Sequence, residues 1–453
     1  MIVETTEWSE ATFGKVKLGD SRRTRRVVQS GARMAANPQG SIPRQMQSWP
    51  AAKAVYRLMN EPEVTHAGLM QPHWEQTRQQ ASEAEVVIII QDTTDLDYTG
   101  REVAGLGPIG DGRGEGFRLH SALAIQPVPR EVMGLMYQWP LIRQAAPVPP
   151  ESSYQRAKRA RESQLWENAV AAIGHAPQGT CWVHMGDRGS DIFGFFQACL
   201  EHGCHFLVRA QEDRRVQVGP NETVTHLKTF ARTLPAQDTK TLTVTDDTKH
   251  PRDATVLVGG SALTIQPPFH SRHLPPIAAW VIRVWEVDPP PDVETPLEWI
   301  LVTSLPTATL AQLHQRITWY ELRPIVEDYH QCLKTGCHLE TRQLKTKDRL
   351  WRLLGILGVV AVRLLQLREW ARQDPARLAH AHFPPDLVHV VALLAGVSPD
   401  RLTVGHLWHC IAQQGGFLGR RRDGSPGWQT LWQGWLHVQT LVEGVRLAVR
   451  LPP

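Results

Sequence analysis

The order of apolar and polar residues predicts helices at both ends of the chain and strands between them. Residues 1 to about 75 follow a helical pattern. From Glu85 the chain runs E-V-V-I-I-I-Q-D-T-T, and such a contiguous, β-branched apolar run is typical of a strand buried on both faces. This strand ends on Asp92. Similar runs predict further strands at 117–125, at 132–139 and directly before Asp187.

The second half of the chain begins with a β-rich region and ends with helices. Helices are predicted near 154–173 and from about Asp191 to Glu201. Five strands are then predicted up to about residue 306: T-L-T-V-T, A-T-V-L-V, A-L-T-I, A-A-W-V-I-R-V-W and W-I-L-V-T-S. Helices resume near Thr309 and dominate to the end. The most apolar stretch, L-L-G-I-L-G-V-V-A-V before Arg363, falls short of the ~20 residues that cross a bilayer and is predicted as a buried helix.

Length and composition bound the class of protein. The 453 residues are enough for two or three domains, and 42% hydrophobic with 21% charged residues excludes wholesale disorder. A net charge of +4 is only mildly basic, so the distribution of charge says more about partners than its total. The acidic N-terminus, M-I-V-E-T-T-E-W-S-E, lacks the basic and apolar regions of a signal peptide. We therefore expect a cytoplasmic protein with no membrane partner.

The cysteines show no paired CxxC spacing. Two groups contain residue types that bind metals: Cys199, Cys204 and His205 in one, and Cys332, Cys337 and His338 in the other. Without a second ligand pair, the favoured interpretation is six core thiols in a reducing compartment.

Three acidic residues stand where sites form in α/β proteins. Asp92 and Asp187 end buried strands, and Glu327 lies on a later helix. Converging carboxylates repel one another unless cations lie between them, and oxygen ligands in this number suit Mg²⁺ or Mn²⁺. Two such ions support displacement at a phosphodiester. An aspartate after a strand is also commonly a turn residue or helix cap. Three nearby aspartates offer the same chemistry: Asp95, Asp97 and Asp191.

The segment Y-E-L-R-P-I-V-E-D-Y-H-Q-C-L-K surrounds Glu327 with polar side chains. On a single helix of 3.6 residues per turn, Tyr320, Arg323 and Lys334 would share one face with it. That face would extend roughly 20 Å and suit a charged polymer. A solvated face with ion pairs is the other interpretation. Pro324 disfavours helical geometry at the residue before it, so the helix could instead begin at Pro324.

Basic residues also gather near the N-terminus. In L-G-D-S-R-R-T-R-R, four arginines follow a capping Asp20 at the start of a predicted helix: Arg22, Arg23, Arg25 and Arg26. Positive charge at this end opposes the helix macrodipole, so it does not stabilise the helix. An anionic partner or a solvated surface would account for it.

The trio Q-D-T-T, G-D-R-G-S-D and Y-x2-R-x3-E-x6-K resembles the ribonuclease-H-like DDE transposases. It is most similar to the bacterial insertion-sequence family with a Y-R-E-K signature, typified by the transposon-five transposase. The resemblance extends along the chain through L-G-D-S-R-R-T-R-R, T-P-L-E-W-I-L-V-T-S, A-V-R-L-L-Q-L-R-E, G-G-F-L-G-R-R-R-D-G and W-Q-T-L-W-Q-G-W. It implies an α/β fold with a ribonuclease-H-like mixed sheet. The implied domains are a helical DNA-end-binding domain at 1–75, a catalytic domain at 76–374 with a β-rich insertion at about 205–306, and a helical dimerisation domain at 375–453.

The resemblance also implies a function and a set of site residues. The enzyme would be a homodimeric cut-and-paste transposase that nicks transposon ends, forms and resolves hairpins, and joins the ends to target DNA. Asp92 would be shared between two Mg²⁺ or Mn²⁺ ions, with Asp187 and Glu327 completing one each. Tyr320, Arg323 and Lys334 would bind phosphates. The remaining DNA contacts implied are Trp299, Arg209, Arg22, Arg23, Arg26 and Arg57.

Some of these roles have competing interpretations. Trp299, as a strand residue, would ordinarily belong to a core rather than stack on a displaced base. A non-cutting regulator of transposition would need neither a complete carboxylate trio nor basic end-binding residues. A plain two-metal nuclease would leave the β-rich insertion and Trp299 without a task.

Overall fold

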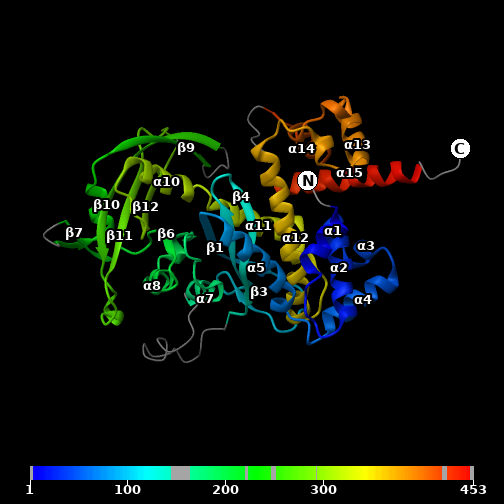
Figure 1. The fold of residues 1–453 in the computed structure, drawn as a ribbon, viewed down its shortest axis with the longest axis horizontal. Helices are drawn as coiled ribbons and strands as arrows, with labels where there is room; N and C mark the ends of the chain where they lie inside the picture. The colour runs from blue at the N-terminus through cyan, green and yellow to red at the C-terminus, as the bar shows by residue number, and fades with distance from the viewer. Residues whose placement is uncertain are drawn as a thin grey trace.

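A 12-stranded mixed sheet runs through the middle of the chain. The computed structural model describes residues 4–143, 164–219, 223–245, 251–291, 293–420 and 426–448. Strands follow the order β2-β3-β1-β5-β6-β12-β11-β10-β7-β8, with β4 paired to β3 and β9 to β10 (Figure 1). Their bounds are β1 (Val86–Asp97), β2 (Gly107–Ile109), β3 (Gly114–Gln126), β4 (Glu131–Leu141), β5 (Cys181–Gly186), β6 (His205–Arg209), β7 (Arg215–Val218), β8 (Thr223–His226), β9 (Asp238–Thr245), β10 (Pro251–Ile265), β11 (Ile277–Glu286) and β12 (Glu298–Thr303).

The half of the sheet from β4 to β6 is built on β1. This strand pairs antiparallel with β3 and parallel with β5, and β5 continues parallel to β6. Its apolar residues Val87 to Ile90 are completely buried, as expected for a strand covered on both faces. The order β4-β3-β1-β5-β6, antiparallel first and parallel after, is the ribonuclease-H-like arrangement. The predicted fold class is therefore confirmed.

The β-rich region continues the same sheet. Strand β6 lies beside β5 and pairs on its other edge with β12, which connects the core to β11 and β10. One prediction is wrong: A-T-V-L-V and A-L-T-I are halves of the single strand β10. Gly259 and Gly260 do not interrupt it, because both pair in register with β11, and Gly259 allows Pro235 to approach closely.

Most of the helices lie on the side of β1, β3 and β4, and β7 and β10 lie at the opposite side of the molecule (Figure 1). The predicted helix near 154–173 is described only from Gln164 onward. The α-helices are α1 (Thr5–Phe13), α2 (Ser21–Ala36), α3 (Ile42–Met46), α4 (Trp49–Asn60), α5 (His66–Glu83), α7 (Gln164–Ile173), α8 (Phe193–Glu201), α9 (Leu227–Thr233), α10 (Leu310–Tyr320), α11 (Pro324–Gln331), α12 (Lys347–Gln373), α13 (Pro385–Ala395), α14 (Val404–Gln414) and α15 (Trp428–Ala448).

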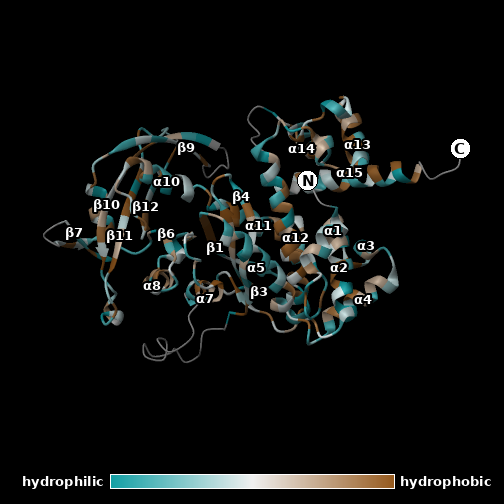
Figure 2. Cartoon of the chain, viewed as in Figure 1, coloured by the Kyte–Doolittle hydropathy of each residue, from teal (hydrophilic) through white to brown (hydrophobic). Residues whose placement is uncertain are grey.

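Helix α12 is the central connection between these parts. It packs against β4, α5 and α2, and Figure 2 shows hydrophobic residues along it where it passes between the sheet and the N-terminal helices. The apolar run extends into a longer helix than the sequence pattern predicted, and by length and composition alone this helix could cross a membrane, with a mean hydropathy of 1.7 over its most apolar 18 residues. However, 78% of that window is buried, as in the core helix of a folded domain. The prediction of a buried helix is confirmed.

The cysteines are core residues. All six are free thiols, and only Cys181 is more than slightly exposed. No group of three or more metal-binding side chains forms among the residues that the structure describes. The interpretation of the cysteines as core thiols therefore holds.

Candidate active site

The first two carboxylates lie on neighbouring strands of the sheet. The prediction that the first strand ends on Asp92 is wrong, because β1 continues to Asp97 and stays paired with β3, whereas Asp187 directly follows the end of β5. Strands β1 and β5 are parallel neighbours, and Ile90 pairs with Met185 at the end of their register. Asp92 and Asp187 each lie two residues further along. Because adjacent strands lie about 4.8 Å apart, this register brings the two aspartates side by side. The parallel pairing thus joins residues that are far apart in the sequence.

Asp92 is held from two sides. The Thr93 amide donates a hydrogen bond to Asp92 Oδ1 at 2.8 Å, and Nδ1 of the buried His330 lies 3.6 Å from Oδ2. Burial alone would raise the pKa of Asp92, but His330 and the Thr93 amide outweigh it and hold that pKa below its usual value. The carboxyl group is therefore ionised at neutral pH.

Glu327 lies on α11, which packs against β1 and β3. Its carboxylate pairs with Arg323, with Nη1 and Oε1 2.6 Å apart. The Glu327 side chain is 53% exposed, whereas that of Arg323 is only 22% exposed. Burial disfavours the charged form of Arg323, but the attraction of Glu327 and of Asp92 outweighs it and raises the pKa. Arg323 therefore interacts with two of the three carboxylates.

The segment around Glu327 is not a single helix. Helix α10 ends at Tyr320, α11 begins at Pro324, and a π-helical turn follows at Cys332–Gly336. Pro324 stands in the first turn of α11, where its missing amide is tolerated, but Arg323 before it keeps helical backbone angles (φ −50°, ψ −42°), contrary to the expected restriction at that residue. Lys334 lies on the π-turn, with Nζ 3.9 Å from Oε1 of Glu340. The prediction that four side chains share one helical face is wrong, and the prediction of a helix start at Pro324 is confirmed.

An aromatic and basic group lies beside Asp187. The rings of Trp299 and Tyr320 meet edge to face with centroids 5.3 Å apart. Arg209 donates from Nη2 to the Glu298 carbonyl at 2.9 Å. Burial raises the pKa of Tyr320 to about 12, although the neighbouring arginines oppose this, and Asp187 interacts electrostatically with both Tyr320 and Arg209. Tyr320 therefore remains a neutral phenol, able to donate a hydrogen bond.

Known protein families match the chain along most of its length. Residues 5–64 match the family described as Transposase DNA-binding, 164–363 that described as Transposase DDE domain, and 359–451 that described as Transposase Tn5 dimerisation domain. The chain belongs to the Tn5-like DDE transposases. The transposase is therefore a DNA-binding, dimer-forming enzyme that cleaves and joins DNA with the help of a divalent metal.

A solved structure is also similar to this transposase. The piggyBac transposase, in a synaptic complex with hairpin DNA, shares 10% sequence identity with it at a TM-score of 0.38. The match covers 99% of this chain and 82% of that one.

The transposase's carboxylates suit a hard divalent cation, because all their donor atoms are oxygens. Within the described ranges, however, no three His, Cys, Asp or Glu side chains lie close enough together to bind one metal ion. In this structure Glu327 is paired with Arg323, and Asp92 lies against His330. Glu327 would have to exchange Arg323 for a metal before the three carboxylates could act as one donor set.

The other aspartates near the site have structural partners. Asp95 forms an ion pair with Arg118 at 2.9 Å. The side chain of Asp191 is completely buried, pairs with Arg214 and accepts two backbone hydrogen bonds. Asp97 accepts a hydrogen bond from the Thr99 amide. Local partners of this kind explain these residues without a catalytic role.

The arginines predicted to bind DNA ends differ in their exposure and in their ion pairs. Arg22 is highly exposed and lies against Asp20, whereas Arg23 is held by Glu61 and Glu63. Arg26 is half-buried and Arg57 is exposed.

Two residues that sequence reasoning passed over also stand out. His330 follows Glu327 by three residues, so an E-x-x-H spacing on one helical face could have indicated it. Trp49 is 67% exposed at the start of α4, the helix that carries Arg57. An exposed tryptophan beside basic residues is a feature that DNA-contacting surfaces share.

Proposed function

We propose that this transposase works by a cut-and-paste route. It would nick each transposon end, use the freed 3′-hydroxyl to form a hairpin on the opposite strand, reopen the hairpin and join the ends to target DNA. The observation that carries this proposal is the meeting of two different groups of side chains. Asp92 and Asp187 lie on neighbouring parallel strands. Asp187 interacts electrostatically with Arg209 and Tyr320, and Asp92 interacts with Arg323, which are residue types that bind phosphate.

In this proposal the carboxylates hold two divalent ions, Mg²⁺ or Mn²⁺, with Asp92 as the shared ligand and Asp187 and Glu327 on one ion each. When bound, such ions lower the pKa of an attacking oxygen and stabilise a leaving one. The low pKa of Asp92 favours this role, because its carboxylate is already deprotonated.

The cations of the chain bind the substrate. Arg323 has a planar guanidinium that can grip a phosphate with two hydrogen bonds once it leaves Glu327. Arg209 is half-buried, which strengthens its attraction to a phosphate in a site with little water. Lys334 lies further along and would contact a more distant phosphate as a point charge.

Trp299 would accept a base displaced from the hairpin. Its ring is partly buried and rests edge-on against Tyr320, so its orientation is fixed before DNA binds. Stacking on such a ring offsets roughly 1–3 kcal/mol per base of lost stacking.

The partners proposed are duplex DNA carrying inverted terminal repeats, target DNA and a second copy of the chain in a synaptic complex. Arg22, Arg26 and Arg57 would contact the ends, Arg23 would contribute charge beside them, and the enzyme would act in the bacterial cytoplasm.

The test is to incubate the purified protein and Mg²⁺ with linear DNA that carries candidate terminal repeats. Hairpin-ended products should form, and they should be lost in Asp92→Ala. The matched control is Asp95→Ala, which removes an aspartate of the same strand that pairs with Arg118. Random metal-dependent degradation without hairpins would contradict the cut-and-paste proposal and favour a nuclease.

A further inference from the structure

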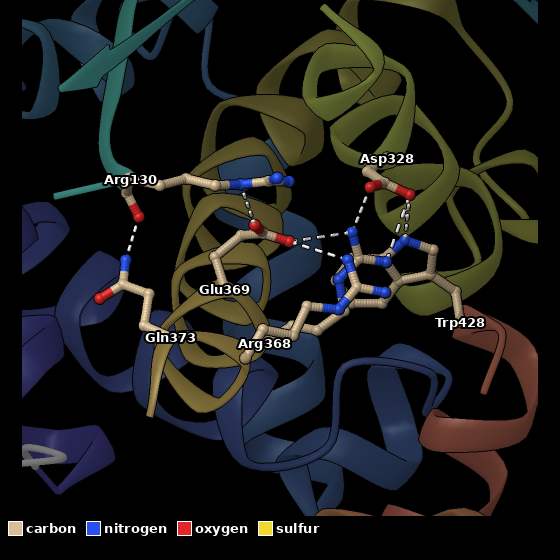
Figure 3. A network of polar contacts seen from close by, with 7 residues as sticks. Arg130, Asp328, Arg368, Glu369, Gln373 and Trp428 are labelled. Atoms are coloured by element: carbon tan, nitrogen blue, oxygen red, sulfur yellow. Dashed lines mark hydrogen bonds and ion pairs between the residues drawn. The ribbon is translucent and has the colours of Figure 1, made fainter. Parts of the chain in front are cut away.

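The residue after Glu327 connects the catalytic helix to the C-terminal part of the chain. Asp328 lies on α11 and faces Arg368 of α12 and Trp428, the first residue of α15. Figure 3 shows the three side chains converging, with the carboxylate of Asp328 above the stacked guanidinium and indole. Three helices that are distant in sequence therefore meet beside a carboxylate of the site.

Arg368 and Trp428 both donate hydrogen bonds to the carboxylate of Asp328. Arg368 donates from Nη1 to Asp328 Oδ1 at 3.2 Å and forms a second ion pair with Oδ2. The Trp428 Nε1 donates to the same Oδ1 at 3.1 Å. The Arg368 guanidinium also lies 4.0 Å from the centre of the Trp428 ring. Because Arg368 is only 7% exposed, these charge-assisted contacts are poorly screened by solvent.

Ion pairs on the other side of its guanidinium group fix the position of Arg368. Glu369, which is 3% exposed, accepts hydrogen bonds from Arg368 at 3.2 Å and from Arg130 at 3.0 Å. Arg372 lies 3.1 Å from the same carboxylate. Figure 3 shows Arg130 reaching this group from the sheet side. The position of Arg368 is thus fixed by α12 and the sheet, and Asp328 and Trp428 both attach to it.

A second contact joins α15 to the segment after α11. Trp432 stacks on Trp428 with ring centroids 5.8 Å apart. A Cβ added at Gly336 would lie 3.1 Å from Trp432 Nε1, so the ring lies directly against the π-turn. Residues of the dimerisation segment 359–451 therefore contact both α11 and the π-turn that follows it.

Helix α11 depends on such contacts for its position. It has only eight residues, and no side chain caps its N-terminus. A helix this short is unstable by itself, so packing and tertiary hydrogen bonds must hold it. A small displacement of α11 would move Glu327 relative to Asp92 and Asp187.

We propose that Asp328, Arg368 and Trp428 are positioning residues that couple the placement of the C-terminal dimerisation segment to that of Glu327. The inference rests on the proposed role of Glu327 as a metal ligand. When α15 is seated, Asp328 is gripped and Glu327 is held at the sheet edge. When α15 is displaced, α11 loosens and the third carboxylate is lost from the site.

The test uses two mild substitutions. Asp328→Asn keeps the shape and removes the charge, and Arg368 still has Glu369 as a partner, so no unpaired buried charge results. Trp428→Phe keeps a ring beneath the guanidinium and removes the N–H donor. The matched control is Trp370→Phe, since Trp370 lies two residues beyond Arg368 and stacks with Arg377 instead.

Metal use is measured on the full chain as Mn²⁺ binding, from the electron paramagnetic resonance of free Mn²⁺, and as the Mg²⁺ concentration for half-maximal cleavage. Cleavage rate, DNA affinity, dimer formation and unfolding temperature are measured on the same preparations. Both variants should bind Mn²⁺ several-fold more weakly, need several-fold more Mg²⁺ and cleave about tenfold to a hundredfold more slowly. DNA affinity and dimer formation should match the wild type. The double variant should lose less than the product of the two single losses.

The outcomes separate the two proposals. Metal binding and metal dependence equal to those of the wild type in both variants would overturn the coupling. It would also be overturned if the loss of cleavage were fully explained by a smaller fraction of folded protein. If Glu327→Gln leaves Mn²⁺ binding and cleavage unchanged, the proposed role of Glu327 is wrong, and the coupling falls with it.

Discussion

At the scale of single residues, the partners of a carboxylate decide its role. Asp187 and Asp191 belong to the same G-D-R-G-S-D motif. The Asp187 carboxylate accepts a short-range hydrogen bond from the Gly189 amide and is partly exposed. Asp191 is completely buried and neutralised by Arg214. The residue type is the same, but one carboxylate is available to a ligand and the other is not.

Substitution should separate these two aspartates. Asp187→Asn should reduce cleavage on the order of 100-fold or more without loss of stability, because an amide can still accept the Gly189 hydrogen bond. Asp191→Asn should instead lower the free energy of unfolding by about 3 kcal/mol, since it leaves Arg214 buried without its anion. Urea unfolding and cleavage assays on both variants measure this. Loss of cleavage in a fully stable Asp191→Asn would contradict it.

At the scale of elements, two short helices, α11 and α4, carry polar and charged side chains that we expect to take part in function. Pro324 ends the preceding turn and starts α11, so Glu327 and His330 face the sheet edge from one helical turn. Helix α4 plays a comparable part in the N-terminal region. Trp49, Lys53 and Arg57 are spaced four residues apart and are all exposed, so they form one face of the helix.

The face of α4 should bind DNA through its charge. Arg57→Ala should weaken binding to terminal-repeat DNA and reduce the slope of log affinity against log salt by about 1, as the loss of one phosphate contact requires. Arg23→Ala is the comparison, since Arg23 is already paired with Glu61 and Glu63 and should change that slope less. Titrations at several salt concentrations measure both. Equal changes in slope for the two variants would contradict this prediction, because they would show that Arg23 contacts DNA as much as Arg57 does despite its ion pairs with Glu61 and Glu63.

At the scale of the whole molecule, α12 links the parts. It contacts the N-terminal helices, the sheet, α11 and α14. Its last turns carry Arg368 and Glu369, where the C-terminal segment meets α11. A change of position at one end of α12 can therefore reach the site through rigid, packed structure.

The C-terminal segment should form the dimer through its exposed apolar residues. Leu393 on α13 is 80% exposed and Leu447 on α15 is 62% exposed. Leu393→Glu and Leu447→Glu should each weaken the DNA-bound dimer about tenfold, since a buried interface leucine contributes over ~1 kcal/mol. Light scattering after size exclusion measures the mass. Val224→Glu, at a 47% exposed position on β8, is the control, and dimers that persist in both leucine variants would exclude this surface.

The sequence by itself determined the local structure. Apolar β-branched runs specified the buried strands, Pro324 specified the start of α11, and the end of a strand specified Asp187 as a candidate. Asp92 was found by the same reasoning although its strand does not end there, because polar residues carry β1 on to Asp97. These features depend on short-range sterics and on the period of the pattern, so neighbouring residues are sufficient to predict them.

Only the tertiary structure decided which side chains meet. The parallel register of β1 and β5 brings the aspartates together, His330 adds a partner to Asp92, and Trp428 reaches Asp328 from the far end of the chain. It also separated Lys334 from the face of Glu327 and joined A-T-V-L-V to A-L-T-I in one strand. Such contacts depend on packing between distant segments, and no spacing along the chain fixes them.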